Sequence, residues 1–80
     1  MAKRQRLTER LVKAAEPGTR AYQLFDTEVL GLSIVVQKSG TRGFYLDYRM
    51  KGRARRMAIG RWPEWSVVAA RERAKELRRL

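Results

Sequence analysis

The sequence predicts an α+β domain in which a three-stranded antiparallel β-sheet packs against a C-terminal α-helix, with a short N-terminal helix and an additional short strand. From Phe44 to Lys51, bulky apolar side chains occupy every second position, as in a strand with one buried face. Turn segments containing glycine lie on both sides of this stretch, and apolar residues recur at helical spacing after Ser66. A chain of 80 residues has room for one domain with a small core.

The N-terminal part divides into a tail and a helix. Residues 1–6 are polar and basic without periodicity, so we expect a flexible basic arm, followed by a single domain over residues 7–80. Thr8 is a suitable N-cap, and Glu9 favours the positive end of a helix dipole. These residues predict a helix of about two turns that ends before Pro17.

The middle of the chain is expected to form strands. Residues 22–26 are rich in β-formers and are expected to be the additional short strand. A hairpin loop around Gly40 and a tight turn at Lys51 and Gly52 then join the strands of an antiparallel meander, and Gly60 is expected to end its last strand. These strands are predicted at residues 32–37, 44–50 and 54–59.

The C-terminal helix is expected to begin at Ser66, a good N-cap, after Pro63 has interrupted the strand. Trp65 precedes this cap and is expected to pack on Ala70 as a hydrophobic staple. Met57 is expected to join the core from the third strand. The shared core of sheet and helix is predicted to contain Phe44, Leu46, Tyr48, Ile59, Ala70, Ala74 and Leu77.

Charge is the strongest indication of function. The chain carries 19 Lys and Arg against 8 Asp and Glu, a net charge of +11. Such an excess on a small domain favours a polyanionic partner, and duplex DNA is the foremost candidate. Cys and His are absent from the sequence, which excludes disulfides, cysteine or histidine zinc sites, and His-dependent catalysis. No apolar run approaches the roughly 20 residues of a membrane span, so we expect a soluble, cytoplasmic protein without a membrane partner.

Two groups of residues are predicted to contact DNA. Strand alternation places one group on the sheet face away from the helix, where they can reach base edges in a major groove: Gln37, Tyr45, Arg49 and Arg56. The other group lies at or near turns, where phosphates would pass: Lys38, Arg42, Lys51, Arg53 and Arg55. Any single arginine here could belong to a strand face that is exposed to solvent and has no binding role. That explanation fits less well the five basic residues between Arg49 and Met57, a stretch that contains no acidic residue.

Other candidate sites carry less weight. The basic residues of the predicted C-terminal helix alternate with Glu72 and Glu76, which is typical of a helix face exposed to solvent. These basic residues are Arg71, Arg73, Lys75, Arg78 and Arg79. Trp62 and Trp65 are interpreted as core residues. The scattered acids Asp26, Glu28 and Asp47 have no spacing that suggests a metal site, and the segment KSGTRG lacks the ending of a phosphate-binding loop. We therefore expect no catalytic site, no cofactor and no small-molecule substrate.

The order of several segments resembles a known family. They are LTERLVKAAEPG, FDTEVLGLSIVV, SGTRGFYLDYR and GRARRMAIGRWPEWSVVAARERAKELR, with Ile59-Gly60, Pro63, Ser66 and Ala70-Arg71 the most telling residues. From Leu7 to Leu80 the chain resembles the N-terminal arm-type DNA-binding domain of tyrosine recombinases, the integrases of phages and genomic islands.

This resemblance implies a sheet that lies in the major groove of arm-type sites, and hence a role in site-specific integration and recombination. It also implies a full-length protein that continues into a core-binding domain and a catalytic domain with Arg, His and a nucleophilic Tyr. This chain is then a non-enzymatic part of a recombinase that associates with bacterial nucleoid DNA. Self-association on DNA would occur through the full-length protein.

Two alternatives stay open at this stage. A small basic α+β domain also suits an RNA-binding, ribosome-associated module, although Tyr45 alone is a thin platform for stacking bases. A basic helix over residues 66–80 also suits a protein-interaction or membrane-surface element, although its narrow apolar stripe is needed to cover the sheet. Competition between duplex DNA and structured RNA would separate DNA binding from RNA binding.

Overall fold

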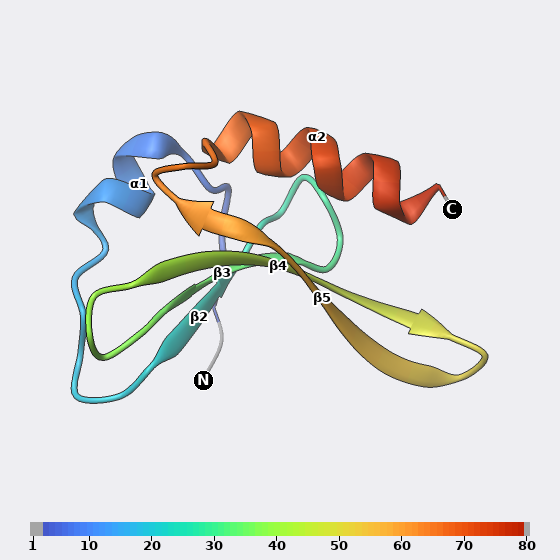
Figure 1. Cartoon of the computed structure of the whole chain (residues 1–80), viewed down its shortest axis with the longest axis horizontal. Coiled ribbons are helices and arrows are strands. Elements are labelled where there is room, and N and C mark those ends of the chain that lie inside the picture. The colour runs from blue at the N-terminus through green and yellow to red at the C-terminus, as the bar shows by residue number, and fades with distance from the viewer. Residues whose placement is uncertain (1–2, 80) are drawn as a thin grey trace.

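The computed structural model describes residues 3–79, which form one sheet covered on a single face by two helices (Figure 1). The strands lie in the order β1-β2-β3-β4-β5, and every pairing between neighbours is antiparallel except that of β1 with β2. The elements in chain order are β1 (Lys3–Arg4), α1 (Glu9–Ala14), β2 (Tyr22–Phe25), β3 (Leu32–Val36), β4 (Arg42–Met50), β5 (Arg53–Trp62) and α2 (Val67–Arg78).

The predicted fold class is confirmed: four antiparallel strands, a short N-terminal helix and a C-terminal helix packed on the sheet. Part of the expected flexible arm is ordered, because Lys3–Arg4 pair with β2 and Gln5 N–H donates to the carbonyl of Phe25 at 2.8 Å. The first two residues of that arm, Met1 and Ala2, lie outside the described residues. An edge strand with free backbone groups gives a nearby polar segment a place to pair.

Helix α1 begins as its capping signal predicts. The hydroxyl of Thr8 accepts a hydrogen bond from Leu11 N–H at 3.1 Å, and Val12 is buried. The carboxylate of Glu9 also contacts the end of β5 and the start of α2. It accepts hydrogen bonds from the indole of Trp62 in β5, at 2.9 Å, and from Val67 N–H at the first turn of α2. A carboxylate near a helix N-terminus interacts favourably with the helix dipole and stabilises the helix. Because Glu9 belongs to α1 and bonds to the first turn of α2, it joins the two helices.

Strand β5 is longer than predicted and does not end at Gly60. Gly60 instead pairs with Phe44 inside the strand, and the chain continues in the sheet to Trp62. The indole of Trp65 lies directly on Gly60, since a Cβ built there would be 2.2 Å from Trp65 Cδ1. Glycine is needed at this position for close packing and not for a turn.

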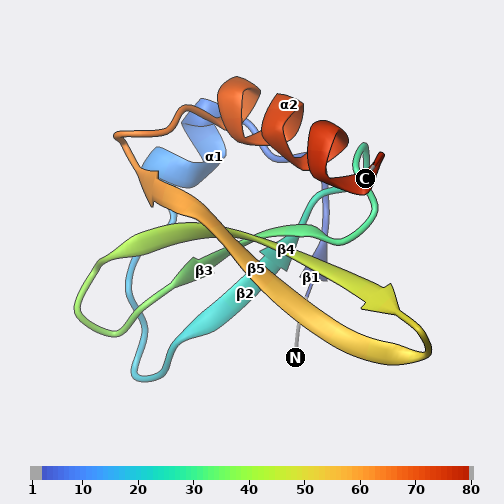
Figure 2. The ribbon, with the colours of Figure 1, turned by 45° about the vertical axis from the view of Figure 1, so that its right-hand side comes forward.

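A β-bulge lies between the two halves of the β4–β5 pairing. Phe44 pairs with Gly60 while Tyr45 pairs with Ala58, which leaves Ile59 without a partner on β4. Beyond the bulge the two strands project as a twisted hairpin past the rest of the sheet (Figure 2). Its turn consists of Lys51 and Gly52, both at positive φ (52° and 78°), which is the pattern of a type I′ turn.

The core lies between the sheet and both helices. Of the predicted core residues, Phe44, Leu46, Ala70 and Ala74 are buried, while Tyr48, Ile59 and Leu77 are half-buried against them. Met57 was wrongly expected in the core. It pairs with Leu46 on the outermost strand, at the rim of the area that α2 covers, and is exposed.

Helix α2 begins after Ser66, whose hydroxyl accepts a hydrogen bond from Ala69 N–H at 3.1 Å. Trp65 and Trp62 pack against the core cluster that contains Ala70, in agreement with their interpretation as core residues. The exposed face of α2 carries the i,i+3 ion pairs Arg73–Glu76 and Lys75–Glu72. Arg71 is an exception to the expected solvated face, because it is buried.

Arg71 is buried because it pairs with Asp26, the residue that follows β2. The guanidinium donates to both carboxylate oxygens of Asp26 and to the carbonyl of Leu7, at 2.9 to 3.1 Å. Asp26 also accepts hydrogen bonds from the N–H groups of Leu7 and Val29, at 3.1 Å each. Burial acts to raise the pKa of Asp26, but the hydrogen bonds from Arg71, Leu7 and Val29 outweigh it and hold that pKa below its ordinary value. This pair fixes the N-terminal segment, the end of β2 and α2 to one another.

Candidate nucleic-acid interface

The sheet face opposite the helices is free of any covering layer in the described part of the chain, and we call it the open face (Figure 1). Phe44 and Leu46 point from β4 into the core, so alternation directs Tyr45 between them to the open face. Side chains of directly paired residues share a face, which identifies the other members. The polar and aromatic residues of this face are Arg4, Gln23, Phe25, Ser33, Tyr45, Asp47, Arg49, Arg56 and Arg61.

Arg56 has the most defined geometry on this face. Its Nε and Nη2 donate to the two carboxylate oxygens of Asp47, at 2.8 and 3.3 Å, across the β4–β5 pairing. Its Cζ lies 5.5 Å from the ring centroid of Tyr45. The hydrogen bonds that Arg56 donates to Asp47 also raise the pKa of its guanidinium above its ordinary value. Arg56 is thus held in one orientation, and within residues 3–79 its Nη1 makes no hydrogen bond.

The ring of Tyr45 lies along the sheet. A Cβ at Gly43 would be 3.2 Å from Tyr45 Cε1, so the absence of a side chain at Gly43 makes room for the ring. Arg61 pairs with Gly43 and therefore lies on the same face, next to Tyr45, and it is exposed. The centre of the open face is a tyrosine with one arginine stacked on it and a second beside it.

The remaining predicted base readers lie at the two ends of this face. Arg49 is exposed on the projecting hairpin, where it pairs with Ala54. Gln37 follows the last residue of β3 at the opposite end and is exposed, and its N–H donates to the carbonyl of Thr41 at 2.8 Å. The structure therefore brings Tyr45 and Arg56 into contact and spreads Arg49 and Gln37 to either side.

The two predicted phosphate-contacting lysines lie at opposite ends of β4. Lys38 is exposed in the loop that precedes β4, and Lys51 is exposed in the turn that follows it. At about 3.3 Å per residue, the nine residues of β4 span about 30 Å. This length is close to the roughly 34 Å of one turn of B-DNA.

Arg42 is the predicted phosphate contact that departs from expectation, whereas Arg53 and Arg55 lie near the hairpin turn as predicted. Arg42 is not at a turn: it donates through Nε and Nη2 to the carbonyl of Ala15, at 3.1 and 2.5 Å, and lies 5.4 Å from the ring centroid of Trp62. It joins the C-terminal end of α1 to the sheet. Arg53 and Arg55 pair with Met50 and Tyr48, which places both on the helix side of the hairpin and not on the open face. Both are exposed.

Sequence reasoning missed Arg61 and Gln23 as members of the open face. Arg61 was missed because Gly60 was interpreted as the end of the strand. Gln23 was missed because the β2 segment was not analysed for its faces, although Leu24 next to it is an apolar core residue; Gln23 Nε2 donates to Ser33 Oγ at 2.8 Å. Strand alternation directs Asp47 to the open face as well, where the structure shows it holding Arg56.

Within residues 3–79 the structure offers neither a cluster of metal ligands nor a membrane-spanning helix. Among residues 3–79, no group of three His, Cys, Asp or Glu side chains is placed to hold a metal ion. Neither helix within that range is long and apolar enough to cross a membrane.

Comparison with known proteins gives consistent results. Residues 7–80 match the family described as Arm DNA-binding domain. The chain is 34% identical over 74 residues to Prophage integrase IntZ of Escherichia coli (strain K12), an alignment that covers 92% of this chain and 18% of that protein. It is 31% identical over 68 residues to the Integrase of Shigella phage Sf6, covering 85% of this chain and 17% of that protein. The chain thus spans less than a fifth of the length of these relatives.

Proposed function

This chain belongs to the Arm DNA-binding domain family of phage and prophage integrases, and we propose that it binds arm-type sites in duplex DNA with its open face in the major groove. The family implies DNA binding in site-specific recombination. The geometry of the open face supports the more specific statements about groove and residues. The observation that carries them is Arg56, oriented by Asp47 and stacked on Tyr45 at the centre of that face.

We assign base reading to the residues of the open face. A two-stranded ribbon fits the major groove, where arginine recognises guanine and glutamine recognises adenine. In this proposal Arg56 and Arg49 donate to guanine, and Gln37 recognises adenine. Arg61 and Gln23 lie on the same face and join this group.

Phosphate contacts are assigned to the ends and flanks of the sheet. Lys38 and Lys51 are separated by the length of β4, so they would reach phosphates on either side of the groove. Arg53 and Arg55 flank the hairpin and could reach the same backbone as Lys51. Arg42 is left out of the proposal, because its guanidinium is engaged by Ala15 and Trp62.

The parent protein is proposed to be a tyrosine recombinase. The relatives are integrases, and the part that matches this chain is less than a fifth of each. We propose that strand cleavage and joining belong to other parts of such a protein, which also provide its self-association on nucleoid DNA. This chain would supply binding and not catalysis.

Selection from a random duplex library tests the proposal. The 80-residue chain should enrich one sequence motif, and should bind it at least tenfold more tightly than a scrambled duplex or a structured RNA of equal length. Cross-peaks of Tyr45, Arg56 and Arg61 should shift in NMR spectra on addition of the enriched duplex. Failure to enrich a motif, or shifts confined to α2, would contradict base reading by the sheet.

A further inference from the structure

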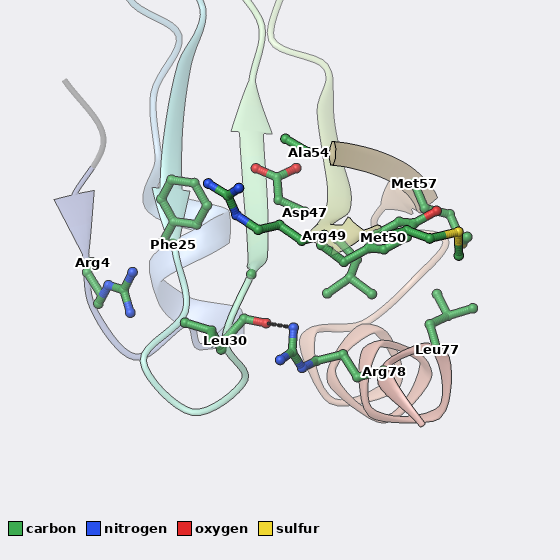
Figure 3. Close-up of a pocket in the computed structure, with 13 residues that line it drawn as sticks. Arg4, Phe25, Leu30, Asp47, Arg49, Met50, Ala54, Met57, Leu77 and Arg78 are labelled. Atoms are coloured by element: carbon green, nitrogen blue, oxygen red, sulfur yellow. Dashed lines mark hydrogen bonds between the residues drawn. The ribbon is translucent and has the colours of Figure 1, made fainter. Parts of the chain in front are cut away.

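A groove runs between the projecting β4–β5 hairpin and the C-terminal end of α2 (Figure 3). Its volume is about 670 Å³. Its apolar lining includes three unusually exposed side chains, Leu30 (58%), Met50 (52%) and Met57 (37%), together with Leu46, Tyr48 and Leu77. Exposed apolar side chains gathered in one concave surface indicate an interaction site.

The groove also contains an unpaired strand edge. The pairing of β3 with β4 stops at Leu32 and Leu46, and Asp47 N–H then donates to the carbonyl of Gly31 at 2.9 Å. Alternate residues of a strand present their backbone groups to the same edge, so the N–H and C=O of Arg49 face this side as well. Within residues 3–79 no backbone group pairs with Arg49 there. An extended peptide can add to such an edge.

Positive charge surrounds the apolar lining. Arg4, Arg49 and Arg78 line the groove, and Arg78 Nη1 donates to the carbonyl of Leu30 at 3.1 Å. The acid of the lining is Asp47, whose carboxylate is already engaged by Arg56. The rim therefore has a net positive charge over an apolar floor.

We propose that this groove binds an extended, acidic segment of a partner protein, in which apolar side chains alternate with Glu or Asp. The segment would add as a strand to the edge of β4 at Arg49, direct its apolar side chains onto Met50 and Leu30, and place its acids near the arginines. A second copy of this chain is disfavoured, because it would bring a further charge of +11 against the same rim. DNA is disfavoured because the floor is apolar and offers few donors to phosphates.

Fluorescence polarisation with a designed probe tests the proposal. The probe is a fluorescein-labelled octapeptide of alternating glutamate and leucine. Its controls are an octapeptide of the same composition with all four leucines at one end, and the alternating peptide N-methylated on the residues that would pair with β4. We expect the alternating peptide to bind roughly tenfold more tightly than either control. Equal binding of all three would overturn the proposal, because only net charge would then matter.

Variants that add a positive charge to the groove distinguish apolar contact with the peptide from electrostatic attraction between the peptide and the basic chain. Met50→Lys and Leu30→Lys should each weaken the alternating peptide roughly tenfold, although both raise the charge of the groove. Val68→Lys is the matched control: it adds the same charge at a residue of α2 that is 64% exposed and outside the groove lining, and it should leave affinity unchanged or slightly higher. Tighter binding by Met50→Lys and Leu30→Lys would overturn the proposal. Far-ultraviolet circular dichroism confirms that each variant is folded.

NMR mapping distinguishes the groove from the DNA-binding face. On addition of the alternating peptide, the amides of Leu30, Met50 and Leu77 should shift. Shifts confined to Tyr45, Arg56 and Arg61 would show that the peptide acts only as a substitute polyanion on the open face, and would overturn the proposal while leaving DNA binding intact.

Discussion

At the scale of the residue, the orientation of Arg56 depends on one carboxylate. An acid on a surface proposed to meet DNA repels phosphates, so Asp47 has a cost that its hold on Arg56 must offset. An oriented guanidinium favours one base over another, whereas a free one contacts phosphates equally well in any sequence. We therefore propose that Asp47 positions Arg56 for base reading.

Asp47→Asn tests this role. Loss of the negative charge should tighten binding to a scrambled duplex by roughly two- to fivefold, while binding to the selected site improves less or weakens. The margin, meaning the ratio of the affinity for the selected duplex to that for the scrambled duplex, should therefore shrink. Glu76→Gln, which removes an acid from the exposed face of α2, is the control and should leave the margin intact. An unchanged margin for Asp47→Asn would show that Arg56 does not read bases.

Base readers and phosphate contacts should respond differently to truncation. Arg56→Ala or Arg49→Ala should remove about 1–3 kcal/mol from binding to the selected site and less from binding to a scrambled duplex. Lys51→Ala should weaken both nearly equally and flatten the salt dependence by about one unit. Isotherms for both duplexes at several salt concentrations measure these effects. Equal proportional losses for all three variants would contradict the assignment of the open face.

The buried pair of Asp26 and Arg71 makes stability depend on pH. The pKa of Asp26 is below its ordinary value in the folded state, so its contribution is fully present above about pH 4 and is lost as the pH falls through the folded pKa. Asp26→Asn should cost about 3 kcal/mol near pH 7, because Arg71 then stays buried with only the partly exposed Glu28 as a charge partner. Denaturation curves should show a smaller difference between parent and variant below pH 4. A difference independent of pH would contradict this origin of stability.

At the scale of the element, β4 joins the core to the proposed interface. Its alternate residues form the centre of the core on one side and the tyrosine platform on the other. Glycines make both arrangements possible, since Gly43 leaves room for Tyr45 and Gly60 for Trp65. Packing on the helix side thus sets the position of the residues on the open face.

Phe44→Ala should therefore unfold or strongly destabilise the domain. Phe44 is fully buried in the cluster that includes Val12 of α1 and Val67 of α2. Its truncation should cost about 3–5 kcal/mol, a large fraction of the stability of a small domain. Thermal denaturation followed by circular dichroism measures the loss. A melting temperature equal to that of the parent would contradict the assignment of the two sheet faces.

At the scale of the whole molecule, charge dominates the expected behaviour. With a net charge of +11, the domain should bind DNA chiefly through released counterions. If about five phosphates are contacted, a plot of log K against log salt concentration should have a slope of about −4 to −5. Titrations of one duplex between low and moderate salt measure this slope. A flat response would contradict phosphate-based binding, whatever the affinity at low salt.

The sequence by itself determined the fold class, the caps and the part of the core that β4 and α2 share, because these depend on local rules. Thr8 and Ser66 cap helices through atoms a few residues away, and the alternation from Phe44 onward fixes which side of β4 is buried. The net charge and the order of motifs also determined the class of partner, in agreement with the family that matches residues 7–80.

Only the tertiary structure decided how the polar side chains are used. Arg42, Arg56 and Arg71 are similar in sequence, yet one joins α1 to the sheet, one is held on the open face and one is buried with Asp26. Their partners lie 27, 9 and 45 residues away, so no local pattern could identify them. The extension of β5 beyond Gly60 likewise depends on pairing with Gly43 and Arg42 of β4, which lie far from it in the sequence.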